Sequence, residues 1–190
     1  MKIDVLKTAT KIAYLAHKGQ FRKYGHSNDC YILHPMRVMG LVLMADPDHA
    51  TEDVLAAAIL HDVMEDSAMT AKDMLEAGIP QGTVDIVAQL TRKKDKRLRS
   101  VRFNEMLNGI KYASRKVKII KLADRADNLG DIVGDKETPF DFATTYAREG
   151  LLLAEALRGT NVFLEARIVL LAARIEHDIV NRIKVNRIKM

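Results

Sequence analysis

The chain has 190 residues, of which 48% are hydrophobic, and a formal net charge of +5. This length and apolar content suffice for one substantial core, so we expect a single domain over residues 1–190. The longest apolar run, Val54 to Leu60, is far shorter than the roughly 18 residues of a membrane-spanning helix, and the N-terminus lacks a secretory signal, so we expect no membrane partner.

The hydrophobic pattern of the first third of the chain predicts helices. Apolar residues at helical spacing indicate a helix over Ile3–Lys18, and Gly and Ser punctuate a loop over 19–28. Pro35 suits the first turn of a helix that runs through Met44. Glu52–His61 is apolar on nearly every side, which predicts a central, buried helix.

The rest of the chain continues in the same way. Thr70 is typical of an N-cap for a short helix to Ala77, which Gly78 ends. Further helices are expected at Gln81–Leu90, Ser100–Tyr112, Arg115–Val133, Phe140–Leu157 and Val162–Ile183. Because no stretch of alternating β-branched residues demands a strand, we expect an all-α bundle of about eight to ten helices.

Basic residues concentrate in Arg92–Arg102 and in a C-terminal helix or tail over 168–190. Aromatic side chains, on which single-stranded nucleic acids stack, do not interleave with them. We therefore interpret these runs as solvated faces and helix C-terminal charge, and expect no nucleic-acid partner.

The single cysteine, Cys30, leaves no intramolecular disulfide to form and favours a cytoplasmic location. Assembly into a homo-oligomer stays open.

The stretch AAILHDVMEDS places two pairs of ionisable residues one helical turn apart, His61 with Asp62 and Glu65 with Asp66. Residues four apart share a helix face, so we expect the four groups together at a helix end. An imidazole beside a carboxylate binds a divalent cation well, and a second acidic pair can manage protons. This pattern predicts a reactive site.

The expected helix Arg115–Val133 contains a second informative stretch, VKIIKLADRADNL. It is largely apolar, yet Lys121, Asp124, Asn128 and Asp131 fall on one polar stripe. A buried carboxylate without a partner is costly, so Asp124 needs a cation. Taken alone, this segment is equally compatible with an ordinary salt bridge or a solvated stripe.

A third stretch, AHKGQFRKYG followed by NDCYILHP, carries His34 and a basic pair. His34 precedes Pro35 where the chain enters a helix, so its imidazole can be held in one orientation. In isolation, such a histidine is more often a hydrogen-bonded core residue than a ligand. Arg22 and Lys23 lie in the preceding loop, and such groups grip phosphate or stack on a base.

The remaining histidines lack such company. His177-Asp178 lies in the last expected helix with no acidic pair a turn later, so we interpret it as a decoy. His17, His26 and His49 are assigned to packing, capping or solvent.

Taken together, these histidines and carboxylates resemble the HD-domain metal-dependent phosphohydrolases. The strings AHKGQFRKYG, YILHP, AAILHDVMEDS, KLADRADNL and RGTNVFLE are more particular and look like the hydrolase domain of the RelA/SpoT family. The chain is most similar to its stand-alone small alarmone hydrolases, over about residues 11–167. The resemblance implies a helical HD fold around one Mn²⁺ and removal of the 3′-pyrophosphate from guanosine tetra- or pentaphosphate, which leaves GDP or GTP.

The resemblance also implies a role for each matching position. The metal ligands would be His34, His61, Asp62 and Asp124. Glu65 and Asp66 would be the catalytic acidic pair, and Asn128 would lie beside the nucleotide and the attacking water. Further contacts to the nucleotide would come from Arg22, Lys23 and Tyr146.

Elementary chemistry agrees with these roles. Two imidazoles and two carboxylates leave positions open on a manganese-like ion, which can bind water and lower its pKa. Glu65 or Asp66 can then position the nucleophile and carry a proton to the leaving oxygen, and the division of labour between them stays open. Nearby Arg and Lys side chains neutralise charge on the phosphoryl oxygens.

Three departures from the family pattern bear on the substrate. Tyr24 follows the basic pair, NDC precedes Tyr31, and Asp127 stands before Asn128, where it is expected to add negative charge near the pocket of a polyanion. The alternatives are therefore another nucleotide, such as (p)ppApp, NADPH or a nucleoside monophosphate, or a catalytically silent nucleotide-binding HD module.

Overall fold

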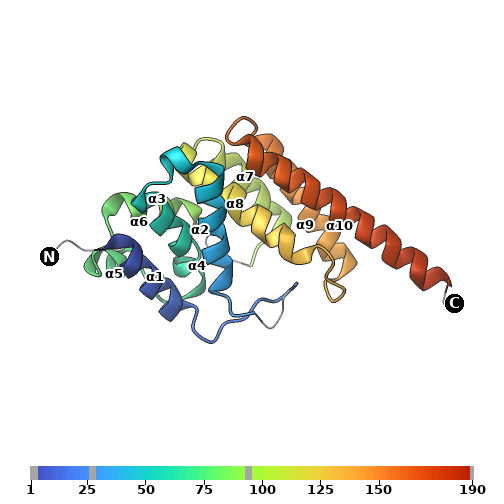
Figure 1. Ribbon diagram of the computed structural model, residues 1–190, viewed down its shortest axis with the longest axis horizontal. Helices are drawn as coiled ribbons and strands as arrows, with labels where there is room; N and C mark the ends of the chain where they lie inside the picture. The colour runs from blue at the N-terminus through green and yellow to red at the C-terminus, as the bar shows by residue number, and fades with distance from the viewer. Residues whose placement is uncertain (1–3, 26–28, 93–95, 189–190) are drawn as a thin grey trace.

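The protein folds into helices joined by short loops (Figure 1). The computed structural model describes residues 4–25, 29–92 and 96–188, and within these ranges the β-type pairing is limited to one isolated antiparallel bridge, between Phe21 and Cys30. The all-α expectation is confirmed. The described helices are α1 Val5–Ala16, α2 Leu33–Ala45, the 3-10 helix η1 Pro47–His49, α3 Glu52–Leu60, α4 Val63–Asp66, α5 Ala71–Glu76, α6 Gln81–Leu90, α7 Arg99–Ile110, α8 Arg115–Ile132, α9 Phe140–Ala156 and α10 Val162–Ile188.

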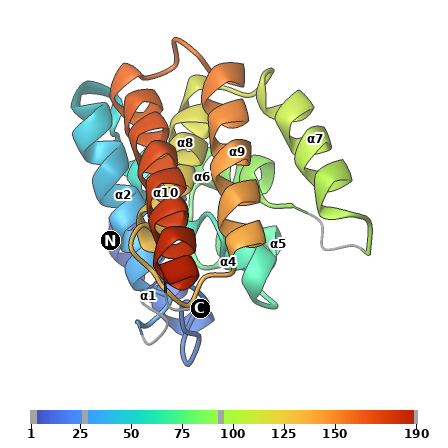
Figure 2. The ribbon, with the colours of Figure 1, turned by 90° about the vertical axis from the view of Figure 1, so that its right-hand side faces the viewer.

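Two helices form the centre of the fold, α3 and α8. α3 packs against α1, α2 and α6, and its residues from Val54 to Leu60 are buried except for Leu55. α8 packs against α2 on one side and against α9 and α10 on another, and these four helices stand side by side in Figure 2. The apolar sequences of α3 and α8 therefore hold a polar site at the middle of the bundle.

The helix boundaries lie close to the sequence expectations. Asp4 caps α1 by accepting a hydrogen bond from the Lys7 amide, and Thr70 caps α5 in a capping box with Asp73. The last helix is longer than expected and ends at Ile188. Residues 1–3 and 26–28, which the expected first helix and loop include, lie outside the described residues.

The helix that delivers His61 ends at that residue. α3 stops at Leu60, the chain turns at His61 and Asp62, and α4 begins at Val63. The Asp62 carbonyl accepts hydrogen bonds from the backbone amides of both Glu65 and Asp66, at 3.1 and 2.9 Å. The four ionisable groups thus lie together at a helix end, as expected, but a tight turn between α3 and α4 separates the two pairs.

Glycine allows two close approaches around α8. Gly150 lets α9 pack closely, because a Cβ there would lie 2.9 Å from a methyl carbon of Leu129. Gly25 has a φ of +76°, and a Cβ there would lie 2.1 Å from the carbonyl oxygen of Asp131. The loop that carries Arg22 can therefore lie directly on the end of α8.

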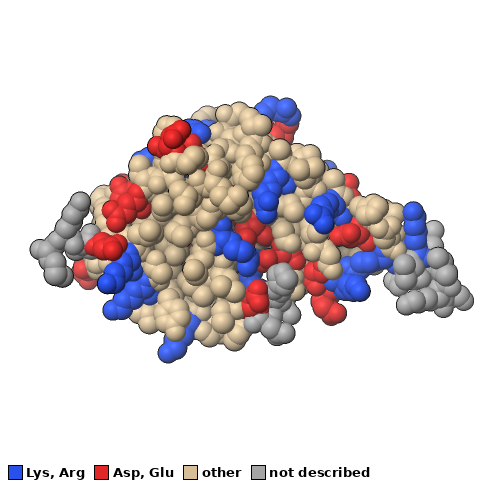
Figure 3. Space-filling view, viewed as in Figure 1, with Lys and Arg blue, Asp and Glu red and all other residues tan. Residues whose placement is uncertain are grey.

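The surface carries both signs of charge. On the face shown in Figure 3, basic and acidic side chains are interspersed and do not gather by sign. In the three described ranges, no helix is both long enough and apolar enough to span a bilayer.

Candidate active site

Four side chains from three parts of the fold converge at the centre of the bundle. His34 comes from the first turn of α2, His61 and Asp62 from the turn after α3, and Asp124 from the middle of α8. The Nε2 atom of His34 lies 3.6 Å from Asp62 Oδ2 and 3.4 Å from Asp124 Oδ1. The Nε2 atom of His61 lies 3.1 and 3.8 Å from the same two oxygens. The structure thus brings together the four residues that the sequence suggested as metal ligands.

The two imidazoles are oriented as metal ligands would be. His61 Nδ1 lies 2.8 Å from the carbonyl oxygen of Ala58, and His34 Nδ1 lies 2.6 Å from Asp127 Oδ2. Both acceptors favour a proton on Nδ1, so Nε2 is the nitrogen that can bind an ion once the imidazole is neutral. Both Nε2 atoms are buried and have no hydrogen-bond partner within the described part of the chain. Single ligand atoms of His34, His61 and Asp62 all lie within 4.8 Å of one another, so this donor set fits a divalent cation.

Opposite charges dominate the electrostatics of this cluster. Burial lowers the pKa values of His34 and His61, but the neighbouring carboxylates outweigh it and raise them to about 9 and about 10. Burial likewise raises the pKa values of Asp62 and Asp124, yet the adjacent cationic groups hold both well below their usual range. In the metal-free protein, protonated imidazoles therefore balance ionised carboxylates.

Asp124 has two further partners on its own helix. Lys121 Nζ donates to Asp124 Oδ2 at 2.8 Å, and Asn128 Nδ2 donates to Asp124 Oδ1 at 2.5 Å. The salt bridge that the sequence left as an alternative is therefore present. It occupies one carboxylate oxygen, while the other faces the two imidazoles.

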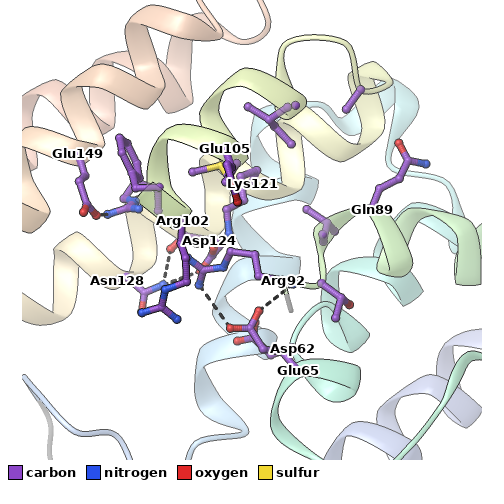
Figure 4. A pocket seen from close by; sticks show the side chains of 18 of the residues that line it. Asp62, Glu65, Gln89, Arg92, Arg102, Glu105, Lys121, Asp124, Asn128 and Glu149 are labelled. Atoms are coloured by element: carbon purple, nitrogen blue, oxygen red, sulfur yellow. Dashed lines mark hydrogen bonds and ion pairs between the residues drawn. The ribbon is translucent and has the colours of Figure 1, made fainter. Parts of the chain in front are cut away.

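The acidic pair lies at the wall of a cavity of about 760 Å³. Glu65 and Asp66 line it together with Asp62 and Asp124. Arg92 extends toward Glu65, with its backbone amide at 3.3 Å and its guanidinium at 3.5 Å from the carboxylate (Figure 4). Two of the proposed ligands, Asp62 and Asp124, thus line the same cavity as the acidic pair.

The basic run Arg92–Arg102 is largely exposed in its described part, as expected, but it also contributes to the cavity. Arg92 and Arg97, which precede α7, and Arg99 and Arg102, in its first turn, all line the cavity. The Nε of Arg102 is buried and has no hydrogen-bond partner in the described part of the chain. These side chains bring cationic groups to the cavity wall, a placement that the solvated interpretation did not include.

Tyr146 lies on the cavity wall, where the resemblance placed a nucleotide contact. The guanidinium of Arg125 lies 4.0 Å from the centre of its ring and that of Arg99 lies 5.2 Å away. Arg99 also forms a two-point ion pair with the buried Glu149, with both contacts at 2.8 Å. Tyr146 is therefore held between two cations that are themselves fixed.

The basic pair of the first loop is placed differently from the expectation. Arg22 donates from Nη2 to Asn128 Oδ1 at 2.5 Å and from Nε to Asp131 Oδ2 at 2.9 Å. Lys23 is exposed and lies over the ring of Tyr24. Among the described residues, the cavity lining includes neither Arg22 nor Lys23. Arg22 therefore supports Asn128, a cavity residue, from behind.

Asp127 does not add negative charge to the cavity, which corrects a second expectation. Its carboxylate accepts from Arg37 at 2.7 and 3.0 Å and contacts His34 Nδ1 at 2.6 Å. It is 7% exposed, and it is not among the residues that line the cavity in the described ranges. Its position on α8 turns it toward α2, where Arg37 balances its charge.

The other histidines lie away from this cluster. His17 is buried with its ring 4.7 Å from that of Tyr31, and the exposed His49 pairs with Asp46. In the decoy pair, His177 is exposed and Asp178 accepts a hydrogen bond from a backbone amide of the loop after α8. His26 lies outside the described residues.

Comparison with known proteins agrees with this geometry. The HD domain family matches residues 31–129, which include all four converging side chains. The chain is 32% identical over 165 residues to the guanosine-3′,5′-bis(diphosphate) 3′-pyrophosphohydrolase MESH1 of Xenopus tropicalis, covering 84% of this chain and 88% of that one. For MESH1 of Drosophila melanogaster the identity is 30% over 161 residues, with coverages of 82% and 86%.

A bacterial relative and a solved structure extend the comparison. The guanosine-3′,5′-bis(diphosphate) 3′-pyrophosphohydrolase of Haemophilus influenzae is 34% identical over 133 residues, which are 66% of this chain but 19% of the bacterial protein, so the chain spans about a fifth of that relative. A solved structure described as a metazoan ortholog of SpoT that hydrolyses ppGpp superposes with a TM-score of 0.79. It is 26% identical, and the superposition covers 90% of this chain and 95% of that one.

Proposed function

The chain belongs to the HD-domain family, and we propose that it removes the 3′-pyrophosphate from guanosine tetra- or pentaphosphate. Relatives that carry the name of this reaction and match most of the chain support the proposal. One observation carries it: among the described residues, two buried Nε2 atoms without a hydrogen-bond partner face two carboxylates that line a cavity together with several arginines.

An HD domain implies a divalent metal, and we propose manganese, held by His34, His61, Asp62 and Asp124. A mixed set of imidazole nitrogens and carboxylate oxygens suits such an ion. When bound, it supplies Lewis acidity toward water and a phosphoryl oxygen. The nitrogens and oxygens already face one another in the metal-free protein, so binding requires loss of the imidazole protons and little rearrangement.

The acidic pair would manage the protons of the reaction. Water adds to the phosphorus next to the ribose, the bond from that phosphorus to O3′ breaks, and O3′ must gain a proton as pyrophosphate leaves. Glu65 and Asp66 line the cavity beside the proposed ligands, so they can take a proton from the water and return one to O3′. Such proton transfer contributes about 10²- to 10⁴-fold to a rate.

The arginine wall would hold the anionic remainder of the substrate. A cavity of about 760 Å³ is of the size that takes a nucleotide. Arg92 and Arg102 lie where phosphoryl charge would accumulate, and we propose Tyr146 and Asn128 as nucleotide contacts on the same wall. Arg22 and Lys23 stay proposed contacts from the resemblance alone.

A panel of nucleotides tests the proposal. Purified protein with Mn²⁺ is given guanosine tetraphosphate, guanosine pentaphosphate, (p)ppApp, NADPH and GMP, and pyrophosphate and orthophosphate are measured separately. We expect pyrophosphate with GDP or GTP from the two guanosine nucleotides. Release of orthophosphate from NADPH or GMP alone would show that one of these nucleotides, and not guanosine tetra- or pentaphosphate, is the substrate. Metal binding without any product would show a catalytically silent module.

Two further features belong to the proposal. We propose that residues 1–190 form one domain, because α10 packs on α8, which carries Asp124 of the proposed metal site. A cytoplasmic location rests on the single cysteine.

A further inference from the structure

Behind the proposed metal site, a chain of charged contacts leads from one ligand residue to another without crossing the cavity. It begins at His34, whose Nδ1 lies 2.6 Å from Asp127 Oδ2. His34 is fully buried and Asp127 is 7% exposed, so water competes little for this contact. A carboxylate can only accept here, and therefore it draws the proton of the imidazole onto Nδ1.

Arg37 holds that carboxylate in place. It lies one turn after His34 on α2, and it donates from Nε to Asp127 Oδ1 at 2.7 Å and from Nη2 to Oδ2 at 3.0 Å. The same Nη2 reaches Asp131 at 2.9 and 3.0 Å. Asp127 and Asp131 are four residues apart on α8, so one guanidinium on α2 clamps two successive carboxylates of α8.

The contacts then return to the site. Asp131 accepts from Arg22 Nε at 2.9 Å, and Arg22 Nη2 donates to Asn128 Oδ1 at 2.5 Å. Asn128 in turn donates to Asp124, the second ligand residue, at 2.5 Å. Two proposed ligands on different helices are thus braced through one network, which lies outside the cavity lining except at Asp124 and Asn128.

We infer that Asp127 and Arg37 are positioning residues of the metal centre. Asp127 holds His34 in the tautomer whose Nε2 lone pair faces the ion, and Arg37 holds Asp127 while fixing α2 against α8. This inference rests on the proposed metal centre and is independent of which nucleotide is hydrolysed. Outer partners of this kind are worth about 10- to 100-fold in metal affinity or activity.

The tautomer of His34 distinguishes a positioning role of Asp127 from a role in packing alone. In Asp127→Asn, the amide oxygen would take the Oδ1 position and keep the hydrogen bond from Arg37 Nε. The NH₂ group would take the Oδ2 position, where it would face His34 Nδ1 and could no longer accept from Arg37 Nη2. That group can only donate, so it would favour a proton on Nε2, the atom that must bind the ion. Asp127→Asn has the same shape as the wild-type residue, so a role in packing alone predicts almost no effect, whereas positioning predicts a large one.

The test is a titration of metal-free protein with Mn²⁺, and with Co²⁺ as a spectroscopic probe, in the absence of nucleotide. We expect Asp127→Asn to weaken Mn²⁺ binding about 10- to 100-fold, at least as much as Asp127→Ala, and to alter the visible Co²⁺ spectrum. Asp178→Asn is the matched control, because its carboxylate also accepts a hydrogen bond but on α10, and it should bind Mn²⁺ like the wild type.

Arg37 provides the second pair of variants. Arg37→Gln should weaken Mn²⁺ binding, and Arg37→Lys should recover part of the loss, because lysine keeps the charge but cannot bridge both carboxylates. Circular dichroism and thermal midpoints of the metal-free variants confirm that each is folded. Wild-type affinity in Asp127→Asn would overturn the positioning role alone, whereas a wild-type chain that binds neither ion would overturn the metal centre and this role with it.

Discussion

The phenolic hydroxyl of Tyr31 donates a hydrogen bond to Asp62 Oδ2 at 2.7 Å, and the same oxygen lies 3.1 Å from His61 Nε2. Burial, together with the charge of Asp62, raises the pKa of Tyr31 above its usual range, so the hydroxyl keeps its proton and remains a donor. Tyr31 thus orients a proposed metal ligand from the cavity side. It stands three residues before His34 in the string YILHP, which was the signal that sequence reasoning overlooked.

Removal of this hydroxyl should weaken the metal site. We expect Tyr31→Phe to lower Mn²⁺ affinity about tenfold, because a hydrogen bond to a charged group is worth about 1.5 to 3 kcal/mol and the ring itself stays in place. Isothermal titration measures the affinity. Tyr14→Phe, at an exposed tyrosine of α1, is the control and should bind Mn²⁺ normally. Equal affinity in both variants would contradict the orienting role of Tyr31.

The ligands and the acidic pair should separate by their effects on metal and turnover. His61→Ala should lose both metal binding and hydrolysis, because it removes a donor atom. Combining Glu65→Gln with Asp66→Asn should keep the metal while lowering the rate at least about 10²-fold, because the shapes remain but proton transfer is lost. Metal content and pyrophosphate release are measured on the same samples. His177→Ala, in the decoy pair, should change neither, and normal turnover in the double variant would refute the proton-transfer role.

Metal binding should release protons. The carboxylates raise the pKa values of His34 and His61 to about 9 and about 10, so both imidazoles are protonated near neutral pH and the ion must displace their protons. We therefore expect Mn²⁺ affinity to rise with pH up to about 9 to 10 and nearly two protons to be released per ion near neutral pH. Titration calorimetry in two buffers of different ionisation enthalpy counts these protons.

The same shifts determine how the metal-free protein responds to pH. Both folded-state pKa values exceed the ordinary histidine value of about 6.5, so the protonated pair stabilises the fold most fully below about pH 6.5. This contribution is lost as the pH rises through about 9 to 10. Bound metal should remove the effect, and an affinity for Mn²⁺ that is independent of pH would rule out the protonated pair.

Arg102 should act on the substrate and leave the metal alone. Its Nε is buried at the cavity wall without a hydrogen-bond partner among the described residues, so a phosphate can satisfy it. We expect Arg102→Ala to raise the KM for guanosine tetraphosphate about 10- to 100-fold, the value of a charge-assisted hydrogen bond, with Mn²⁺ affinity unchanged. Steady-state kinetics measures it, and Arg158→Ala, which removes an exposed ion pair with Glu155, serves as control. A variant with normal KM would exclude Arg102 from the substrate site.

Local patterns predicted the helices and the converging residues well. The apolar run from Val54 to Leu60 favours a buried helix. Thr70 caps the helix after it by accepting a hydrogen bond from the Asp73 amide. Both elements therefore follow from residues that are close together in the chain. The short strings around His34, His61 and Asp124 likewise contain the side chains that converge at the site. The end of the helix at His61 was also expected, whereas the short helix α4 that follows it was not.

The surroundings of the site depended on contacts that no local pattern contains. Asp127 meets His34 across 93 positions of the chain, and Arg22 meets Asp131 across 109. Periodicity says which face of a helix a residue occupies, but not which helix that face will meet. For that reason Asp127 was expected to add charge near the pocket and instead pairs with Arg37 behind it, and arginines that were expected only to be solvated also line the cavity.

By itself, the sequence determined the helical class, the helix positions and the set of groups able to bind a metal, because these depend on spacing within single segments. The packing of α2 against α8, and the contact of Arg92 with Glu65 of α4, decided which oxygen each of these donors reaches. The charge of a side chain is a property of its type, whereas its partner is a property of the assembled fold.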